Sequence, residues 1–221
     1  MGYRQLKQKV LDLMGQADQQ AAMRAIAALP ARRVINPLFG LLHHGDPQVR
    51  WRAVTAMGVV TARLADHDTE GARVIMRRLM WHLNDESGGI GWGAPEAMGE
   101  IMARSERLAG EYARILISYL NPHGNHLEHE GLQAGVLWAV ARLGHTRPAL
   151  VQEAAAFLRP FLSSPDNRLR ALAVLAGGAM GDPQTKAACQ ALATDATPVT
   201  LYWDDDLLQT TVGALAAERP A

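Results

Sequence analysis

The first stretch of the chain with side chains suited to chemistry begins at residue 83 and reads LNDESGGIGWGAPEAMGEI. Asp85 and Glu86 lie in a segment whose glycines permit backbone conformations that are closed to other residues. Further along, Glu96 and Glu100 are four residues apart, which places them on one face of a helix. Trp92 lies between the two pairs of carboxylates. These residue types predict a concentrated negative charge beside an apolar wall.

This stretch has two interpretations. In the simpler one it is a glycine-rich turn in which Asp85 or Ser87 caps the next helix, and Glu96 and Glu100 pair with arginines. In the other it is a partner-binding loop, because loops on a rigid scaffold often carry function. The spacing matches neither a calcium-binding EF-hand loop nor a nucleotide-binding motif.

A second polar stretch, NPHGNHLEHE, covers residues 121–130 and is rich in histidine and glutamate. Both residue types bind transition metals. The metal-ligand candidates are His126, His129 and Glu130, of which His126 and Glu130 share a face if they are helical. The alternative, which we favour, is a solvated loop that caps the helix starting near residue 131.

The two stretches lie one repeat apart, as shown below, and equivalent loops of a repeat protein line one edge. We therefore predict that they form a single acidic cluster with tryptophan beside it. Such a cluster predicts a cationic peptide segment, or a metal, as its partner. Its predicted members are Asp85, Glu86, Trp92, Glu96, Glu100, His126, Glu128, Glu130 and Trp138.

An internal repeat organises the elements that position these residues. The segment GWGAPEAMG at 91–99 aligns with RWRAVTAMG at 50–58, and looser copies follow at 132–144 and 169–181. The successive offsets are 41, 42 and 37 residues. A period of this size is typical of helical hairpins, each too small to bury its apolar face alone. Small residues three apart on one helix face allow a neighbouring helix to approach closely.

The pattern of apolar residues predicts a succession of helices. Asp46-Pro47 and Pro165-Asp166 are expected to start helices, since Asp is a good N-cap. Gly58 and Gly144 are expected near helix C-terminal ends, where a left-handed residue is often needed. Strict alternation is rare, so strands are not expected, and residues 197–206 are interpreted as irregular. The predicted helices are 3–14, 18–29, 33–43, 47–60, 69–82, 94–104, 108–120, 131–143, 148–162, 166–179, 183–194 and 205–217.

The helix predicted at 69–82 has a basic side and an apolar side. Its apolar residues Val74, Ile75, Leu79 and Met80 are expected to point inward. Three arginines, at positions 73, 77 and 78, are expected on the opposite side, as a solvated basic patch.

The repeat resembles the HEAT repeat family. The resemblance rests on Asp46-Pro47-Gln48-Val49-Arg50 followed by Ala53, Ala56 and Met57-Gly58, and on Leu169-Arg170 with Ala173 and Ala176. It covers most of residues 16–195. Two copies depart from the family's aliphatic-Arg pair, with Ile90-Gly91 in one and Gln133 in the Arg position of the other.

The resemblance, which extends to bacterial HEAT-like proteins labelled after phycobilin-lyase repeats, implies an all-α fold. We expect a right-handed α-α superhelix, a HEAT-like solenoid of about five helical hairpins in a single domain. Residues 1–15 would form an N-terminal cap helix, residues 16–195 the repeats and residues 196–221 a C-terminal cap.

Composition limits the function classes. The formal net charge is zero and the pI is about 7.1, although arginines outnumber lysines 19 to 3. A nucleic-acid binder usually shows a basic excess, so nucleic acid is not the expected partner. Cys189 is the only cysteine, which excludes a disulfide framework within one chain. The chain shows no apolar run long enough to span a membrane and no signal-peptide pattern, so we expect a cytoplasmic protein.

Three function classes remain. The resemblance favours a non-catalytic scaffold that binds another protein or peptide, a basic one included, and that needs no cofactor. An enzyme is the second, either metal-dependent through the His/Glu loop or bilin-lyase-like as the repeat label suggests. DNA binding is the third, and it requires a continuous basic surface, to which Arg50, Arg52, Arg73, Arg77 and Arg78 would contribute.

Overall fold

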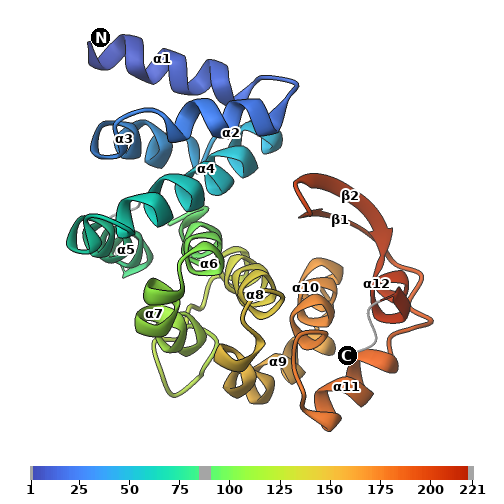
Figure 1. Cartoon of the computed structure of the whole chain (residues 1–221). Coiled ribbons are helices and arrows are strands. Elements are labelled where there is room, and N and C mark those ends of the chain that lie inside the picture. The colour runs from blue at the N-terminus through green and yellow to red at the C-terminus, as the bar shows by residue number, and fades with distance from the viewer. Residues whose placement is uncertain (1, 85–90, 219–221) are drawn as a thin grey trace. The chain divides into compact units, whose positions relative to one another are not determined.

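A computed structural model describes residues 2–84 and 91–218 of the chain. Helices predominate in these residues, and the chain divides into two compact units, residues 1–108 and residues 109–221 (Figure 1). The boundary between the units falls within α7 (Glu106–Ser118). Across the described residues, no helix combines the length and apolar character needed to cross a membrane.

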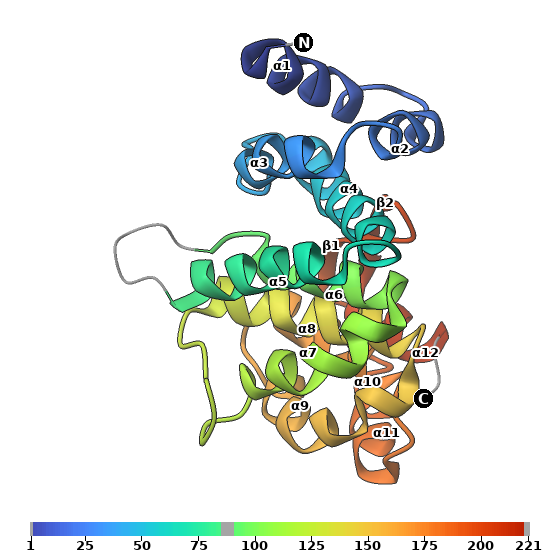
Figure 2. The same cartoon turned by 60° about the vertical axis from the view of Figure 1, so that its left-hand side comes forward.

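The described residues of unit 1 are mainly helical. Helix α4 is central, because it packs against α2, α3, α5 and α6, while α1 packs against α2 and α3. Helices α3 and α5 lie on the same side of α4 in both views (Figures 1 and 2). The helices that precede α7 in this unit are α1 (Tyr3–Met14), α2 (Gln19–Ala27), α3 (Ala31–Leu41), α4 (Pro47–Ala65), α5 (Thr69–Asn84) and α6 (Ala94–Arg104).

Helices α4 and α6 pack against each other, and the small residues of the repeat frame are buried on both. Ala53 and Ala56 of α4 are completely buried, and so is Ala97 of α6. Met57 and Met98, which occupy the same repeat position, are also completely buried. These equivalent positions of the two copies are therefore equally buried, as expected if the repeat reflects helix packing.

The helix starts predicted at the two Asp-Pro or Pro-Asp pairs are confirmed. The Asp46 side chain accepts a hydrogen bond of 2.8 Å from the Gln48 N–H, and Pro47 follows as the first residue of α4. The Asp166 side chain accepts hydrogen bonds from the N–H groups of Arg168 and Leu169, at 2.7 and 3.3 Å. Both carboxylates satisfy N–H groups that lack a partner within the helix.

The expectation for Gly58 and Gly144 is confirmed in part: Gly144 is the last residue of the helix Glu130–Gly144, but neither glycine has the expected left-handed conformation. Gly58 lies in the interior of α4, and the positive φ found among the described glycines belongs to Gly93, at 75°. A Cβ atom on Gly58 would lie 2.5 Å from Cγ of Glu100, and one on Gly144 would lie 2.6 Å from Cβ of Ala179. These glycines are needed because neighbouring segments approach too closely for a methyl group, and not because of their backbone conformation.

Unit 2 repeats the scheme of packed helices and adds a strand pair. Helices α8 and α10 pack side by side, and α9 packs against α10 and α11. The region predicted as one helix at 148–162 consists of two short 3-10 turns, Pro148–Leu150 and Gln152–Ala154, before α9. The helices that follow α7 are α8 (Glu130–Gly144), α9 (Ala155–Leu162), α10 (Asn167–Gly177), α11 (Pro183–Gln190) and α12 (Val212–Glu218).

The C-terminal region corrects the expectation that the chain has no strands. Strands β1 (Pro198–Trp203) and β2 (Asp206–Thr211) pair antiparallel in a two-stranded hairpin, and the C-terminal helix is reduced to α12. Asp204 and Asp205 form the turn with positive φ angles of 50° and 69°. Aspartate tolerates this region, and such turns match the twist of the strands. The hairpin is held by tertiary contacts, because β1 packs against α10.

Candidate functional site

The predicted acidic residues of the first stretch are partly inside the protein. Asp85 and Glu86 lie outside the described residues. Glu96 and Glu100 are 8% and 3% exposed, on a helix that is buried from Ala94 to Ala103. Trp92 is 39% exposed, whereas Trp51 at the equivalent repeat position is buried. The two described carboxylates are therefore part of the interior.

Glu100 has an arginine partner, as the simpler interpretation of this stretch expects. The Arg104 side chain donates a hydrogen bond of 2.6 Å from Nε to Oε1 of Glu100, and its Nη2 lies 2.6 Å from the same oxygen. Gly58 of α4 provides the space that the Glu100 side chain occupies. The carboxylate is thus paired and packed within unit 1.

The second polar stretch caps α8, as we favoured. Nδ1 of His129 accepts a hydrogen bond of 3.1 Å from the Gly131 N–H, at the N-cap position of α8. His126 lies 3.3 Å from the amide nitrogen of Gln133, and Glu128 and Glu130 are exposed. In the part of the chain that the structure describes, no three His, Cys, Asp or Glu residues are grouped to hold a metal ion.

Trp138 is buried against the C-terminal hairpin of its own unit. Its Nε1–H donates a hydrogen bond of 2.7 Å to the backbone oxygen of Tyr202. Its ring meets that of Trp203 edge-on at 6.2 Å, and the His145 ring lies 5.0 Å from that of Trp203. The predicted acidic cluster thus draws on residues of both units, and it stays a prediction.

A different site appears in unit 1, between α3 and α5. It is a groove of about 550 Å³, here called the α3–α5 groove. Its floor contains the buried side chains of Ile35, Leu64 and Ile75. Polar and charged side chains of both helices form its walls. The lining residues are Arg32, Ile35, Asn36, Leu64, Asp68, Glu70, Gly71, Val74, Ile75 and Arg78.

Two arginines join the walls of the α3–α5 groove. Arg32 of α3 is 2.6 Å from Oδ2 of Asp68, in the turn before α5. Arg78 of α5 donates a hydrogen bond of 2.5 Å to Oδ1 of Asn36 on α3, and its Cζ lies 3.9 Å from the centre of the Phe39 ring. Stacking on an aromatic face holds the guanidinium in place by a cation–π interaction.

Asp68 has a second role at the start of α5. Its Oδ1 accepts a hydrogen bond of 3.0 Å from the Gly71 N–H. The hydrogen bond from Arg32, together with that from Gly71, holds the pKa of the Asp68 carboxyl below its ordinary value. The carboxylate therefore stays ionised and can hold Arg32 at neutral pH.

Exposed apolar side chains continue the groove along α5. Val74 is 53% exposed, which corrects the expectation that it points inward, and Trp81 is 71% exposed. Together with Arg78 they recur at spacings of four and three residues, so they share one helix face. Sequence reasoning missed this face because it assigned Val74 to the core and made no assignment for Trp81. The spacing from Val74 through Arg78 to Trp81 was the signal that would have found it.

Three of the arginines suggested for a DNA-binding surface instead make hydrogen bonds or ion pairs within the protein. Arg52 is buried, and its guanidinium donates hydrogen bonds to the backbone oxygens of Met14, at 3.0 Å, and Gln16. Arg73 and Arg77 lie 3.5 and 2.6 Å from the carboxylate of Glu70. Arg52 therefore connects α4 to the end of α1. Arg73 and Arg77 instead pair with Glu70, which lines the α3–α5 groove.

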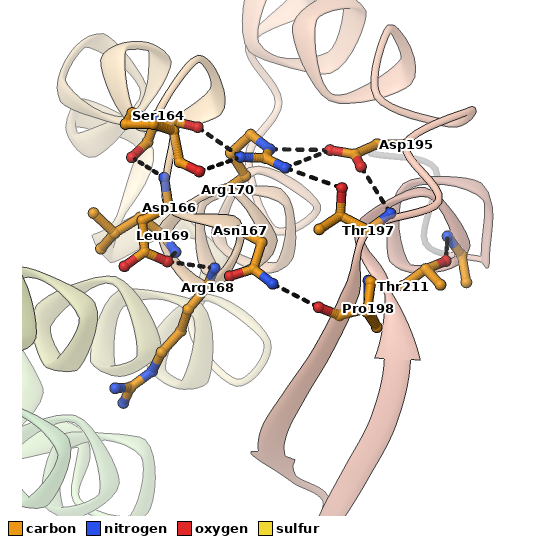
Figure 3. Close-up of polar contacts among 12 residues, drawn as sticks. Ser164, Asp166, Asn167, Arg168, Leu169, Arg170, Asp195, Thr197, Pro198 and Thr211 are labelled. Atoms are coloured by element: carbon orange, nitrogen blue, oxygen red, sulfur yellow. Dashed lines mark hydrogen bonds and ion pairs between the residues drawn. The ribbon is translucent and has the colours of Figure 1, made fainter.

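Arg170, at the family's Arg position, is the centre of a polar network in unit 2 (Figure 3). Its guanidinium donates to the backbone oxygens of Ser164 and Pro165, at 2.7 and 3.0 Å. It also pairs with Asp195 at 2.9 Å and reaches Thr197 at 3.4 Å. Arg170 thus joins the turn before α10 to the segment that leads into β1, and we interpret it as structural.

Comparisons with known proteins support the fold. No family model matches the chain. A protein of Archaeoglobus fulgidus with the description "Uncharacterized protein" is 39% identical over 84 residues, which are 38% of this chain and 43% of that protein. The chain thus spans less than half of the length of this relative.

Three solved structures are similar over nearly their whole length. An engineered protein matches with a TM-score of 0.53 and 16% identity, over 99% of this chain and 95% of that one. A designed armadillo repeat protein in complex with the peptide (KR)4 matches with a TM-score of 0.52 and 19% identity, over 98% and 99%. A second designed armadillo repeat protein has a TM-score of 0.50 and 19% identity, over 96% and 97%. The predicted fold class is confirmed: the chain has a helical-repeat fold similar to that of armadillo repeat proteins.

Proposed function

We propose that this protein is a non-catalytic scaffold that holds a segment of another polypeptide in the α3–α5 groove. The observation that supports this most is an apolar floor lined by the exposed Val74, with the exposed Trp81 two helical turns further along the same face of α5. A contiguous exposed apolar patch with a polar rim is typical of an interaction site. Tryptophan is also enriched among the few residues that dominate binding energy at interfaces.

The chemistry of the groove suits binding rather than catalysis. The lining residues include no hydroxyl, thiol or imidazole group that would serve as a nucleophile or general base. The two carboxylates of the lining, Asp68 and Glu70, are each within ion-pair distance of an arginine. Both α3 and α5 pack on α4, so the walls are rigid elements.

The fold class agrees with this proposal. One protein with the same fold was solved with a peptide bound to it. Repeat folds present long surfaces built from stacked helices, and they bind through surface side chains without a dedicated catalytic centre.

The test begins with a random-peptide phage library selected on the immobilised full-length chain. Enriched peptides are synthesised with a fluorescent label and titrated by fluorescence polarisation against the wild type, Val74→Glu and Trp81→Ala. Both positions are exposed, so we expect the two variants to keep the wild-type circular dichroism and Tm. Removing Trp81 should weaken binding by about 2 kcal/mol, roughly thirtyfold.

A matched control is Tyr3→Ala, because Tyr3 is another exposed aromatic residue of unit 1, on α1, and is 61% exposed. This variant should bind the selected peptides as the wild type does. The proposal fails if no peptide is enriched, or if the enriched peptides bind Trp81→Ala and Tyr3→Ala equally well.

The acidic surface predicted from the sequence is a second proposed location for a partner, in this case a basic one. The peptide held by one armadillo relative is itself basic, which favours it. Because Glu96 and Glu100 are buried, the exposed carboxylates of Glu128 and Glu130 offer the safer test. A labelled Lys-Arg repeat peptide should bind the wild type and lose affinity in Glu128→Gln/Glu130→Gln. Equal binding to both would remove this location.

The enzyme alternative rests on the His/Glu loop. Metal analysis of the purified protein tests it directly. A stoichiometric transition metal that is lost in His126→Ala would favour a metal-dependent activity over the scaffold.

A further inference from the structure

We propose that the segment held by the α3–α5 groove is acidic, with carboxylates that pair with Arg32 and Arg78 on either side of an apolar side chain seated on the groove floor. This inference rests on the proposed function, since it names the kind of partner for the same groove. Its supporting observations are the local charge, the state of the two arginines and the apolar floor between them.

The helices that form the groove are strongly basic in a chain whose net charge is zero. Helix α3, ARRVINPLFGL, contains two arginines and no acidic residue. Helix α5, TEGARVIMRRLMWHLN, contains three arginines and one glutamate. Asp68 in the turn between α4 and α5 adds one more carboxylate to the lining. The two helices and this turn therefore contain five arginines and two carboxylates, of which Arg32, Arg78, Asp68 and Glu70 line the groove. The excess of positive charge around the groove attracts an anionic partner.

Arg78 carries a charge that no carboxylate neutralises within the part of the chain that the structure describes. Its contacts there are the neutral amide of Asn36 and the ring of Phe39. A guanidinium has five N–H donors in a planar fork. One hydrogen bond to Asn36 leaves donors for a partner carboxylate, and the Phe39 ring already holds the group in position. The side chain is therefore pre-organised for a charge-assisted hydrogen bond.

Arg32 can exchange its present partner for a new one at little cost. Its side chain is 78% exposed, and the ion pair with Asp68 is screened by water. A carboxylate from a partner can join or replace Asp68, which keeps its hydrogen bond from the Gly71 N–H.

The apolar side chains of the groove favour a polypeptide over a nucleic acid. Ile35, Leu64 and Ile75 form a floor that suits an aliphatic or aromatic side chain, whereas a phosphate backbone gains nothing from it. Binding of a labelled single-stranded DNA is nevertheless included below, as an outcome that would overturn the inference.

The experiment uses the library selection described above on the full-length chain, and reads the sequences of those peptides whose binding is lost in Trp81→Ala. We expect these groove-dependent peptides to be enriched in Asp and Glu around one bulky apolar residue. Their affinity should fall as sodium chloride is raised, because exposed charge pairs are screened by salt. Replacing their acidic residues with the corresponding amides should weaken binding about tenfold.

Protein variants test the two arginines directly. Arg32→Gln/Arg78→Gln should weaken the acidic peptides about tenfold, while Arg32→Lys/Arg78→Lys should retain most of the affinity because it keeps the charge. The matched control is Arg4→Gln/Arg24→Gln, which makes the same change in net charge at exposed positions outside the groove. Circular dichroism and Tm confirm that each variant is folded.

The outcomes separate the two proposals. Groove-dependent peptides that are neutral or basic, or that bind Arg32→Gln/Arg78→Gln at wild-type strength, would overturn the acidic partner and leave the scaffold intact. An absence of groove-dependent peptides would overturn both. Single-stranded DNA that binds more tightly than any selected peptide, and that loses affinity in the arginine variant, would replace the polypeptide with a nucleic acid.

Discussion

Gly58 shows how a single residue controls the distance between two helices. It lies in the interior of α4, opposite Glu100 of α6, and its missing side chain leaves space for that carboxylate. Glu100 is in turn paired with Arg104. A buried charge is tolerated when it is paired and hydrogen-bonded. Gly58 leaves the space in which the Glu100 carboxylate can meet Arg104, so a larger residue at position 58 would disturb this ion pair.

The first prediction concerns this contact. Gly58→Ala should destabilise the protein by about 1–3 kcal/mol, because the added methyl group would overlap Cγ of Glu100. The matched control is Gly40→Ala on α3, where nothing lies within 4 Å of the added Cβ atom. Alanine is the better helix former, so the control should be neutral or slightly stabilising. Urea unfolding measures both, and equal stability of the two variants would contradict this account of Gly58.

The second prediction concerns Asp68 and pH. The folded protein lowers the pKa of this carboxyl through the Arg32 and Gly71 hydrogen bonds, so the folded state binds the proton less readily than the unfolded state. The resulting stabilisation is fully present above the unfolded-state pKa, and it is lost as the pH falls through the folded-state pKa.

The measurement is Tm as a function of pH, from about pH 6 down to about pH 3, for the wild type and Asp68→Asn. The asparagine keeps an oxygen for the Gly71 N–H but has no proton to take up. The difference in Tm between the two proteins should therefore shrink as the pH falls. A constant difference would show that titration of Asp68 makes no contribution.

At the scale of elements, the C-terminal hairpin depends on two tertiary connections. Trp138 of α8 donates to the backbone of β1, and Arg170 of α10 binds the segment that precedes β1. A two-stranded hairpin is marginal on its own in water. The surrounding helices therefore determine that residues 198–211 form strands.

The third prediction follows from Arg170. Arg170→Gln should lower Tm by several degrees and increase amide exchange in β1 and β2, because it removes the hydrogen bonds to Ser164 and Pro165 and the ion pair with Asp195. The neighbouring exposed residue provides the control, Arg168→Gln, which should leave exchange unchanged. Hydrogen–deuterium exchange measured by mass spectrometry locates the effect. An increase in exchange that is equal throughout unit 2, or that is the same in both variants, would contradict a local role of Arg170.

At the scale of the whole molecule, a balanced net charge hides an uneven distribution. The chain is neutral overall, yet α3 and α5 contain five of its 19 arginines and one glutamate. The net charge of the whole chain therefore does not predict the charge of any single surface, and a neutral chain can still have a basic surface that binds a charged partner.

The fourth prediction is that a bound peptide stabilises the folded chain. At a free concentration about 100 times its Kd, a groove-binding peptide should add about 2.7 kcal/mol by mass action. A thermal-shift titration should show Tm rising with peptide concentration by the same amount for the wild type and for Tyr3→Ala, and by clearly less for Trp81→Ala. A rise of the same size in all three would place the binding site elsewhere.

The sequence alone was sufficient for the repeat, the fold class, most helix positions and the caps at Asp46 and Asp166. These features depend on neighbours within about one turn of the chain, or on a period that recurs along it, so they can be read directly. It also predicted that the loop at 121–130 caps the next helix, which His129 does.

The tertiary structure decided the rest. Whether Glu96, Glu100 and Trp138 are exposed depends on which elements cover their helices. The sequence pattern of α6 and α8 alone does not identify those elements. The α3–α5 groove likewise needs two helices whose facing residues lie more than 30 positions apart, such as Arg32 and Asp68. Local pattern specifies an element and its apolar side, while the identity of its neighbours is a long-range property that only packing establishes.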